Sequence, residues 1–264
     1  MATPNSSLRF RGIALKRKAC AAILCCLLVS IVGFCGPMED AETQLKTARK
    51  AWERAGASTT DGWKFARACF DRAEFASTKT ERSGLAEMGI SAAQEVLRRE
   101  SNNAPGHFYL ALNLGQLART RALSALGLVS DMEKHFLRAI ALQPGFDHAG
   151  PERSLGMLYR DAPGWPASIG SRTKARKHLE RAVELDAAFP ENILTLIETE
   201  AGWEEFKKAQ ARMPTLEARL KAAEAELRGP AWAATWQDWK QRVEIARKRL
   251  AQPLPEAKPV GKAH

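Results

Sequence analysis

The pattern of apolar and polar positions predicts helices along almost the whole chain after the first 36 residues. From residue 151 to 187, Leu155, Leu158 and Tyr159 recur at spacings of three and four, the period of one helix face. After a loop rich in proline and glycine, a second run repeats this period: Ala175, Leu179, Ala182, Val183 and Leu185. This stretch is therefore predicted to form a helix, a loop and a second helix.

The same period predicts further helices on both sides of this stretch. Those before it cover about residues 38–56, 62–76, 85–99, 105–119 and 131–142. Asp61 is the expected N-cap of the second of these helices. Pro144 and Pro214 are expected to end their helices, because proline cannot continue the backbone hydrogen-bond ladder.

Two terminal regions follow the last of these helices. Residues 215–251 are predicted to form capping helices, in which Trp232, Trp236 and Trp239 share one face. Such a face is expected to cover the end of a helix stack, and a ligand surface is the alternative. Residues 252–264, with three prolines, are predicted to be a disordered tail.

Half of the formal net charge of +10 comes from the amino-terminal segment. Residues 1–35 carry five cations and no acids, which leaves 35 basic and 30 acidic side chains in the rest of the chain. The cations precede an uncharged apolar run that ends near residue 36, a pattern typical of a secretory signal. Cys35 is the candidate for lipid attachment, and an uncleaved signal anchor is the alternative. Residues 1–36 therefore predict export to the periplasm or cell envelope, with attachment to the membrane.

The remaining residues contain no pattern typical of catalysis or of metal binding. The five histidines are scattered with no pair three or four residues apart, and Cys69 is the only cysteine beyond the signal segment, where we expect it to be buried in a helix core. Phosphate-binding glycine loops and nucleophile elbows are absent from the sequence. Basic residues are not interleaved with aromatic ones as a base-stacking surface requires. We therefore expect a binding protein without enzymatic activity, cofactor, metal or nucleic-acid partner.

Internal periodicity points to one repeat family. Phe136, Ala139 and Pro144 have the spacing of Phe206, Ala209 and Pro214, and a third set, Leu179, Ala182 and Ala187, lacks only the proline. The Leu155, Gly156 and Tyr159 signature matches the first helix of the same unit. Over about residues 61–214 the chain thus resembles the tetratricopeptide repeat, a pair of antiparallel helices of about 34 residues. The resemblance implies an all-α solenoid of about four repeats with a concave surface or central cavity.

The loop between the two helices of the third repeat is longer than the repeat pattern requires. It contains Pro163, Trp165 and Pro166, and Trp165 could pack over the helix pair and order the insertion. Alternatively, the loop lines a groove for an amphipathic ligand or partner segment. The candidate binding residues are His148, Arg153, Tyr159, Pro163, Trp165 and Pro166.

Residues 150–191 also resemble a narrower family. The signature of Leu155, Gly156 and Tyr159, the run from residue 162 to 166, Ser168 and Gly170 are similar to the T-component of TRAP transporter systems, a family of periplasmic lipoproteins built on helical repeats. This resemblance implies a protein partner, the solute-binding subunit of such a transporter, and a small organic ligand in the cavity. A general scaffold that binds peptides during envelope assembly is the alternative.

Overall fold

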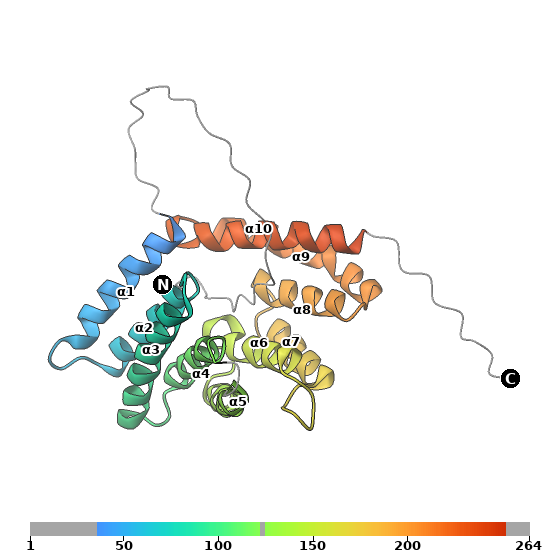
Figure 1. Cartoon of the computed structure of the whole chain (residues 1–264). Coiled ribbons are helices and arrows are strands. Elements are labelled where there is room, and N and C mark those ends of the chain that lie inside the picture. The colour runs from blue at the N-terminus through green and yellow to red at the C-terminus, as the bar shows by residue number, and fades with distance from the viewer. Residues whose placement is uncertain (1–35, 122–124, 252–264) are drawn as a thin grey trace, which may run out of the picture. The chain divides into compact units, whose positions relative to one another are not determined.

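The computed structural model describes residues 36–121 and 125–251, and these residues form ten α-helices joined by short connections (Figure 1). The expected all-α fold, in which helices pack as antiparallel hairpins, is confirmed. None of the helices in these two segments is long and apolar enough to cross a membrane. Cys35, the rest of the signal segment and the tail from Gln252 lie outside the described residues. Contacts divide the chain into two compact units, and the division falls between Ala125 and Leu126.

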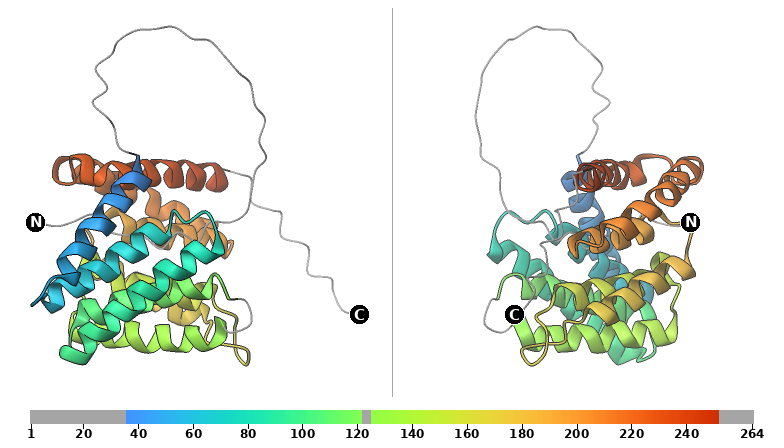
Figure 2. Two further views of the ribbon diagram at one scale, coloured as in Figure 1. Left: turned by 60° about the vertical axis from the view of Figure 1, so that its left-hand side comes forward. Right: turned by 90° about the vertical axis from the view of Figure 1, so that its right-hand side faces the viewer.

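The first unit contains four helices: α1 (Pro37–Glu53), α2 (Thr59–Ala73), α3 (Lys79–Arg99) and α4 (Ala104–Ala118). Helix α2 packs against each of the other three and lies beside α3 (Figure 2). The core is aromatic and aliphatic, with a stacked pair in which the ring centroids of Trp63 and Tyr109 are 5.8 Å apart. Cys69 is fully buried on α2 as expected, and burial raises the pKa of its thiol to about 12.

The cap of α2 differs from the expected one. The N-cap is Ser58, whose Oγ accepts a hydrogen bond from the backbone N–H of Asp61 at 3.2 Å. The Asp61 carboxylate accepts in return from the backbone N–H of Ser58 at 2.9 Å. Asp61 is thus the third helical residue of a capping box, and not the N-cap. The helix begins three residues earlier than predicted.

The second unit contains the remaining helices: α5 (Ala125–Leu142), α6 (Phe146–Asp161), α7 (Arg172–Leu185), α8 (Pro190–Gly202), α9 (Phe206–Glu226) and α10 (Pro230–Leu250). Helix α8 packs against α6, α7, α9 and α10 and is the centre of this unit. The residues that carry the repeat spacing are fully buried as expected: Phe136, Ala139, Leu155, Leu179, Ala182 and Ala209.

Pro144 follows the end of α5 as predicted, but the expected helix end at Pro214 is wrong. Helix α9 continues through Pro214 to Glu226. Ala209, Leu216 and Ala223 are buried at intervals of seven residues, so one apolar stripe runs along the helix on both sides of the proline. Burying that stripe against the neighbouring helices offsets the roughly 3 kcal/mol that an interior proline costs. The expected boundary between repeats and capping helices, at residues 214 and 215, therefore lies inside one continuous helix.

The tryptophans of α10 pack inward, which supports the expected capping role over a ligand surface. Trp232 and Trp239 are buried, and Trp236 is partly buried against the same core cluster. The Phe189 ring meets Trp239 edge to face, with centroids 5.5 Å apart. Trp239 also donates from Nε1 to Glu191 Oε2 at 2.6 Å, so its polar edge is satisfied inside the core.

Buried charges join α10 to α8. Arg242 lies 2.8 Å from the Glu191 carboxylate, 2.7 Å from Glu198 and 3.1 Å from Asp238. Burial alone would raise the pKa of Glu191, but Arg242 and Arg153 together lower it below its ordinary value. The ionised form of Glu191 is therefore the one that the folded second unit stabilises.

The helices of the third repeat approach so closely that one position excludes a side chain. A Cβ atom at Gly156 on α6 would lie 2.7 Å from Leu179 Cγ and 3.1 Å from the backbone nitrogen of Leu179 on α7. Because one of these atoms belongs to the backbone, a side-chain rotation cannot remove the clash. Gly156 thus sets the distance between α6 and α7.

Gly156→Ala is expected to lower the free energy of unfolding by about 1–3 kcal/mol, since the added methyl group overpacks the contact between α6 and α7. Gly84→Ala is the matched control on α3, where nothing lies within 4 Å of the added atom. That exchange should stabilise the chain by about 0.5–1 kcal/mol through higher helix propensity. Urea denaturation of both variants measures the difference. Equal effects would contradict the close approach.

Glu191→Gln is expected to lower the free energy of unfolding at pH 7 by about 1–3 kcal/mol, because Arg242 loses a charged partner. The pKa of Glu191 is lowered on folding, so its contribution is complete above the ordinary value of 4.5 and is lost as the pH falls below it. The variant should consequently lose less stability than the parent between pH 5 and pH 3. Glu217→Gln, at an ion pair whose side chains are both half exposed, is the control and should keep the parent's pH dependence.

Candidate functional site

The connection between α6 and α7 presents an exposed tryptophan. Trp165 is 89% exposed, and Pro163 and Pro166 beside it are exposed as well. The backbone around it is closed by its own hydrogen bonds, from Gly170 N to Pro163 O at 2.8 Å and from Ser171 N to Tyr159 O at 2.9 Å. The loop therefore holds its shape without help from the indole ring.

The interpretation that Trp165 packs over the helix pair is wrong. The loop is instead ordered by a close approach of its two backbone ends. A Cβ atom at Gly170 would lie 2.0 Å from the carbonyl oxygen of Ala162. Glycine at this position lets the two ends of the loop bond directly. The ring is left in solvent.

The alternative interpretation was a groove lined jointly by the loop and α6. The structure shows no such groove among the described residues. Arg153 and Tyr159 are 2% and 3% exposed and belong to the core. The Tyr159 hydroxyl donates to the Glu133 carboxylate on α5, and burial raises the pKa of that hydroxyl. These side chains face into the unit because they lie on the apolar side of α6, whereas the loop of Trp165 extends outward. The six candidate residues therefore fall into separate environments.

Arg153 and Asn192 hold a strained turn at the start of α6. Asp147, His148 and Ala149 have φ values of 51°, 56° and 57°, in the left-handed region that costs a residue with a side chain roughly 1–2 kcal/mol. Arg153 Nη1 donates to the carbonyl oxygen of His148 at 3.0 Å, and Asn192 Nδ2 donates to the same oxygen at 3.2 Å. Burial lowers the pKa of Arg153, although the nearby Glu191 charge opposes this shift.

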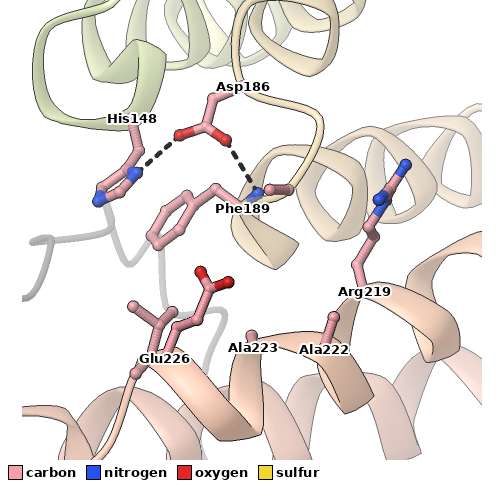
Figure 3. A pocket seen from close by; sticks show the side chains of 9 residues that line it. His148, Asp186, Phe189, Arg219, Ala222, Ala223 and Glu226 are labelled. Carbon is pink, nitrogen blue, oxygen red and sulfur yellow. Dashed lines mark hydrogen bonds and ion pairs between the residues drawn. The ribbon is translucent and has the colours of Figure 1, made fainter.

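The strained turn places His148 at the edge of a pocket. The pocket has a volume of about 190 Å³ and is formed in the second unit by the start of α6, the turn between α7 and α8, and the carboxyl-terminal half of α9 (Figure 3). Its lining residues are His148, Asp186, Ala188, Phe189, Arg219, Ala222, Ala223, Glu226 and Leu227. Of the predicted site residues, His148 alone lines it.

Asp186 fixes the orientation of His148. Its Oδ2 atom lies 2.7 Å from His148 Nδ1, and its Oδ1 atom accepts from the backbone N–H of Phe189 at 3.1 Å (Figure 3). The hydrogen bond with His148 lowers the pKa of Asp186. The imidazole also stacks on the Phe189 ring, with centroids 4.1 Å apart. His148 is thus contacted at three places: its carbonyl oxygen by Arg153 and Asn192, its Nδ1 atom by Asp186, and one ring face by Phe189.

The pocket is lined by charged, aromatic and small apolar side chains. Within the described residues no group of three or more His, Cys, Asp or Glu side chains could hold a metal ion. Sequence reasoning missed the contributions of Asp186, Phe189 and α9. The spacing of Arg219, Ala222, Ala223 and Glu226, at three, four and seven residues, does indicate one helix face, but only the fold shows which pocket that face borders.

The fold is that of a tetratricopeptide-like helical repeat. A solved structure described as a thermophilic tetratricopeptide-repeat protein from Thermus thermophilus, TTC0263, superposes with a TM-score of 0.59 over 79% of this chain and 91% of that one, at 17% sequence identity. A family model described as "Regulator of microtubule dynamics protein 1-3" matches residues 36–149, less than half of the chain. No curated protein sequence matches the chain significantly.

Ala149→Gly tests the strain in the turn before α6. Glycine relieves the left-handed conformation by about 1–2 kcal/mol but removes a buried methyl group worth about 0.8 kcal/mol, so the free energy of unfolding should stay within about 1 kcal/mol of the parent. Ala139→Gly removes an equally buried methyl group from the interior of α5 and should cost about 1–2 kcal/mol. Chemical denaturation of the pair gives the difference. If Ala149→Gly were the more damaging exchange, the turn would not be strained.

Proposed function

We propose that this protein is a non-catalytic helical-repeat scaffold that binds another protein, and that the Trp165 loop is part of the contact surface. The observation that carries the proposal is the 89% exposure of Trp165 on a loop closed by backbone hydrogen bonds. Tryptophan is among the residues that contribute most to protein–protein binding energy. A loop already ordered before binding loses little conformational entropy on association.

A narrower version of the proposal names the partner. The sequence resemblance of residues 150–191 to TRAP T-components supports the solute-binding subunit of a transporter as the protein that docks on the loop. The cationic start and apolar run within residues 1–36 support a location in the cell envelope, attached to the membrane through the amino terminus. A scaffold for envelope assembly remains the alternative, and the two differ in which protein is captured.

Trp165→Ala is expected to reduce capture of the partner at least about tenfold while leaving the melting temperature unchanged, because the ring makes contacts only in the complex. The measurement is cross-linking and affinity capture of the full-length chain from its native cells, with bound proteins quantified by mass spectrometry. Leu137→Ala, at another exposed apolar side chain of the second unit, is the matched control and should capture as the parent does.

The identity of the captured protein distinguishes a transport accessory from a general scaffold for envelope assembly. A solute-binding subunit that depends on Trp165 supports the transport accessory, and a multiprotein envelope assembly supports the general scaffold. Capture that is equal for the parent and Trp165→Ala would refute the role of the loop. Fractionation that finds the chain away from the envelope would refute the proposed location.

A further inference from the structure

Two side chains of opposite charge, Arg219 and Glu226, line the pocket beside His148. Within the described residues, neither Arg219 nor Glu226 makes an ion pair or hydrogen bond through its side chain. They are seven residues apart on α9, which puts them two turns apart on one helix face, roughly 10 Å along the axis. The pocket therefore has a cationic end and an anionic end.

The space between these charges is apolar and shallow. Ala222 and Ala223 form the floor, and Phe189 lies opposite them (Figure 3). Ala188 also lines the pocket. The methyl side chains of Ala222 and Ala223 leave space for a ligand that longer side chains would occupy. A ligand with charged ends and an apolar middle matches this order of groups.

The anionic end carries an additional acceptor. The Asp186 carboxylate accepts a hydrogen bond from His148 Nδ1, so Nε2 is the ring nitrogen that can accept a hydrogen bond from a ligand. In Figure 3, His148 and Glu226 lie at the same end of the pocket, and Arg219 stands at the other. The Glu226 carboxylate can pair with an ammonium group at this end of the pocket, and the guanidinium of Arg219 can pair with a carboxylate at the other.

The volume limits the size of the ligand. A dry cavity of about 150 Å³ holds a benzene molecule, so about 190 Å³ accommodates a molecule of one to two amino-acid residues. Two residues in extended form span about 7 Å, and the side chains of Arg219 and Glu226 can close the rest of the distance between their backbones.

We propose that this pocket binds a dipeptide-sized zwitterion, with its ammonium group at the end formed by Glu226 and His148 and its carboxylate on Arg219. The strained turn, Arg153, Asn192 and Asp186 then act as positioning residues that hold His148 in place. The pocket does not include Trp165, so this site can succeed or fail independently of the protein-binding role.

The test is isothermal titration calorimetry of the full-length chain with alanyl-leucine and with its N-acetylated and C-amidated forms. The free dipeptide is expected to bind at least about tenfold more tightly than either blocked form, because each blocked form loses one charge-assisted interaction. Arg219→Gln should abolish the preference for the free carboxylate, and Glu226→Gln should abolish the preference for the free amine.

Lys221→Gln and Glu224→Gln are the matched controls, since both exposed side chains lie on α9 outside the pocket lining. They should bind alanyl-leucine as the parent does. The proposal is overturned if the parent binds none of the three compounds at millimolar concentration. It is equally overturned if the blocked forms bind as well as the free dipeptide, or if the control exchanges weaken binding as much as the pocket exchanges.

Discussion

The structure depends on one constraint: paired helices approach each other so closely that some positions have no room for a side chain. Gly156 faces Leu179 in the second unit, and Gly89 faces the buried Asn113 in the first. At the latter contact an added Cβ would lie 2.3 Å from the amide oxygen of Asn113, whose nitrogen donates to backbone carbonyls on α2 and α4. These two contacts thus limit the spacing of α6 from α7 and of α3 from α4.

That spacing explains why strain and buried charge gather at the start of α6. The chain must leave α5, reverse and enter α6 within a few residues, and it does so through three left-handed residues ending at Ala149. The cost is offset by a charged donor, Arg153, and an amide, Asn192, that converge on one carbonyl oxygen. Because α8 supplies both Asn192 and the Glu191 that pairs with Arg242, the same helix stabilises the turn and the capping helix α10.

The fold could be predicted from the sequence because it is encoded locally. The spacing of Leu179 and Ala182 on α7 specifies a buried stripe whatever the partner helix is, and the burial of both residues confirms it. The expectation for Pro214 was wrong for a related reason. A proline usually ends a helix, but the stripe through Leu216 continues on its far side, and the sum of burial along α9 outweighs the local cost.

The candidate site could not be predicted in the same way, because its residues are brought together only by tertiary packing. Arg153 was expected to line a binding groove, yet it is buried, and Asn192, 39 positions away, and the His148 carbonyl supply its acceptors. Trp165 looked like a residue that orders its loop, yet Gly170 lets the backbone do so alone. An aromatic ring that contributes nothing to the loop's closure is available for contact with another molecule. Trp239, which bonds Glu191 inside the core, is not. The two tryptophans thus differ in their surroundings: Trp239 is enclosed by the core of the second unit, whereas Trp165 is 89% exposed on a loop that its own backbone hydrogen bonds close.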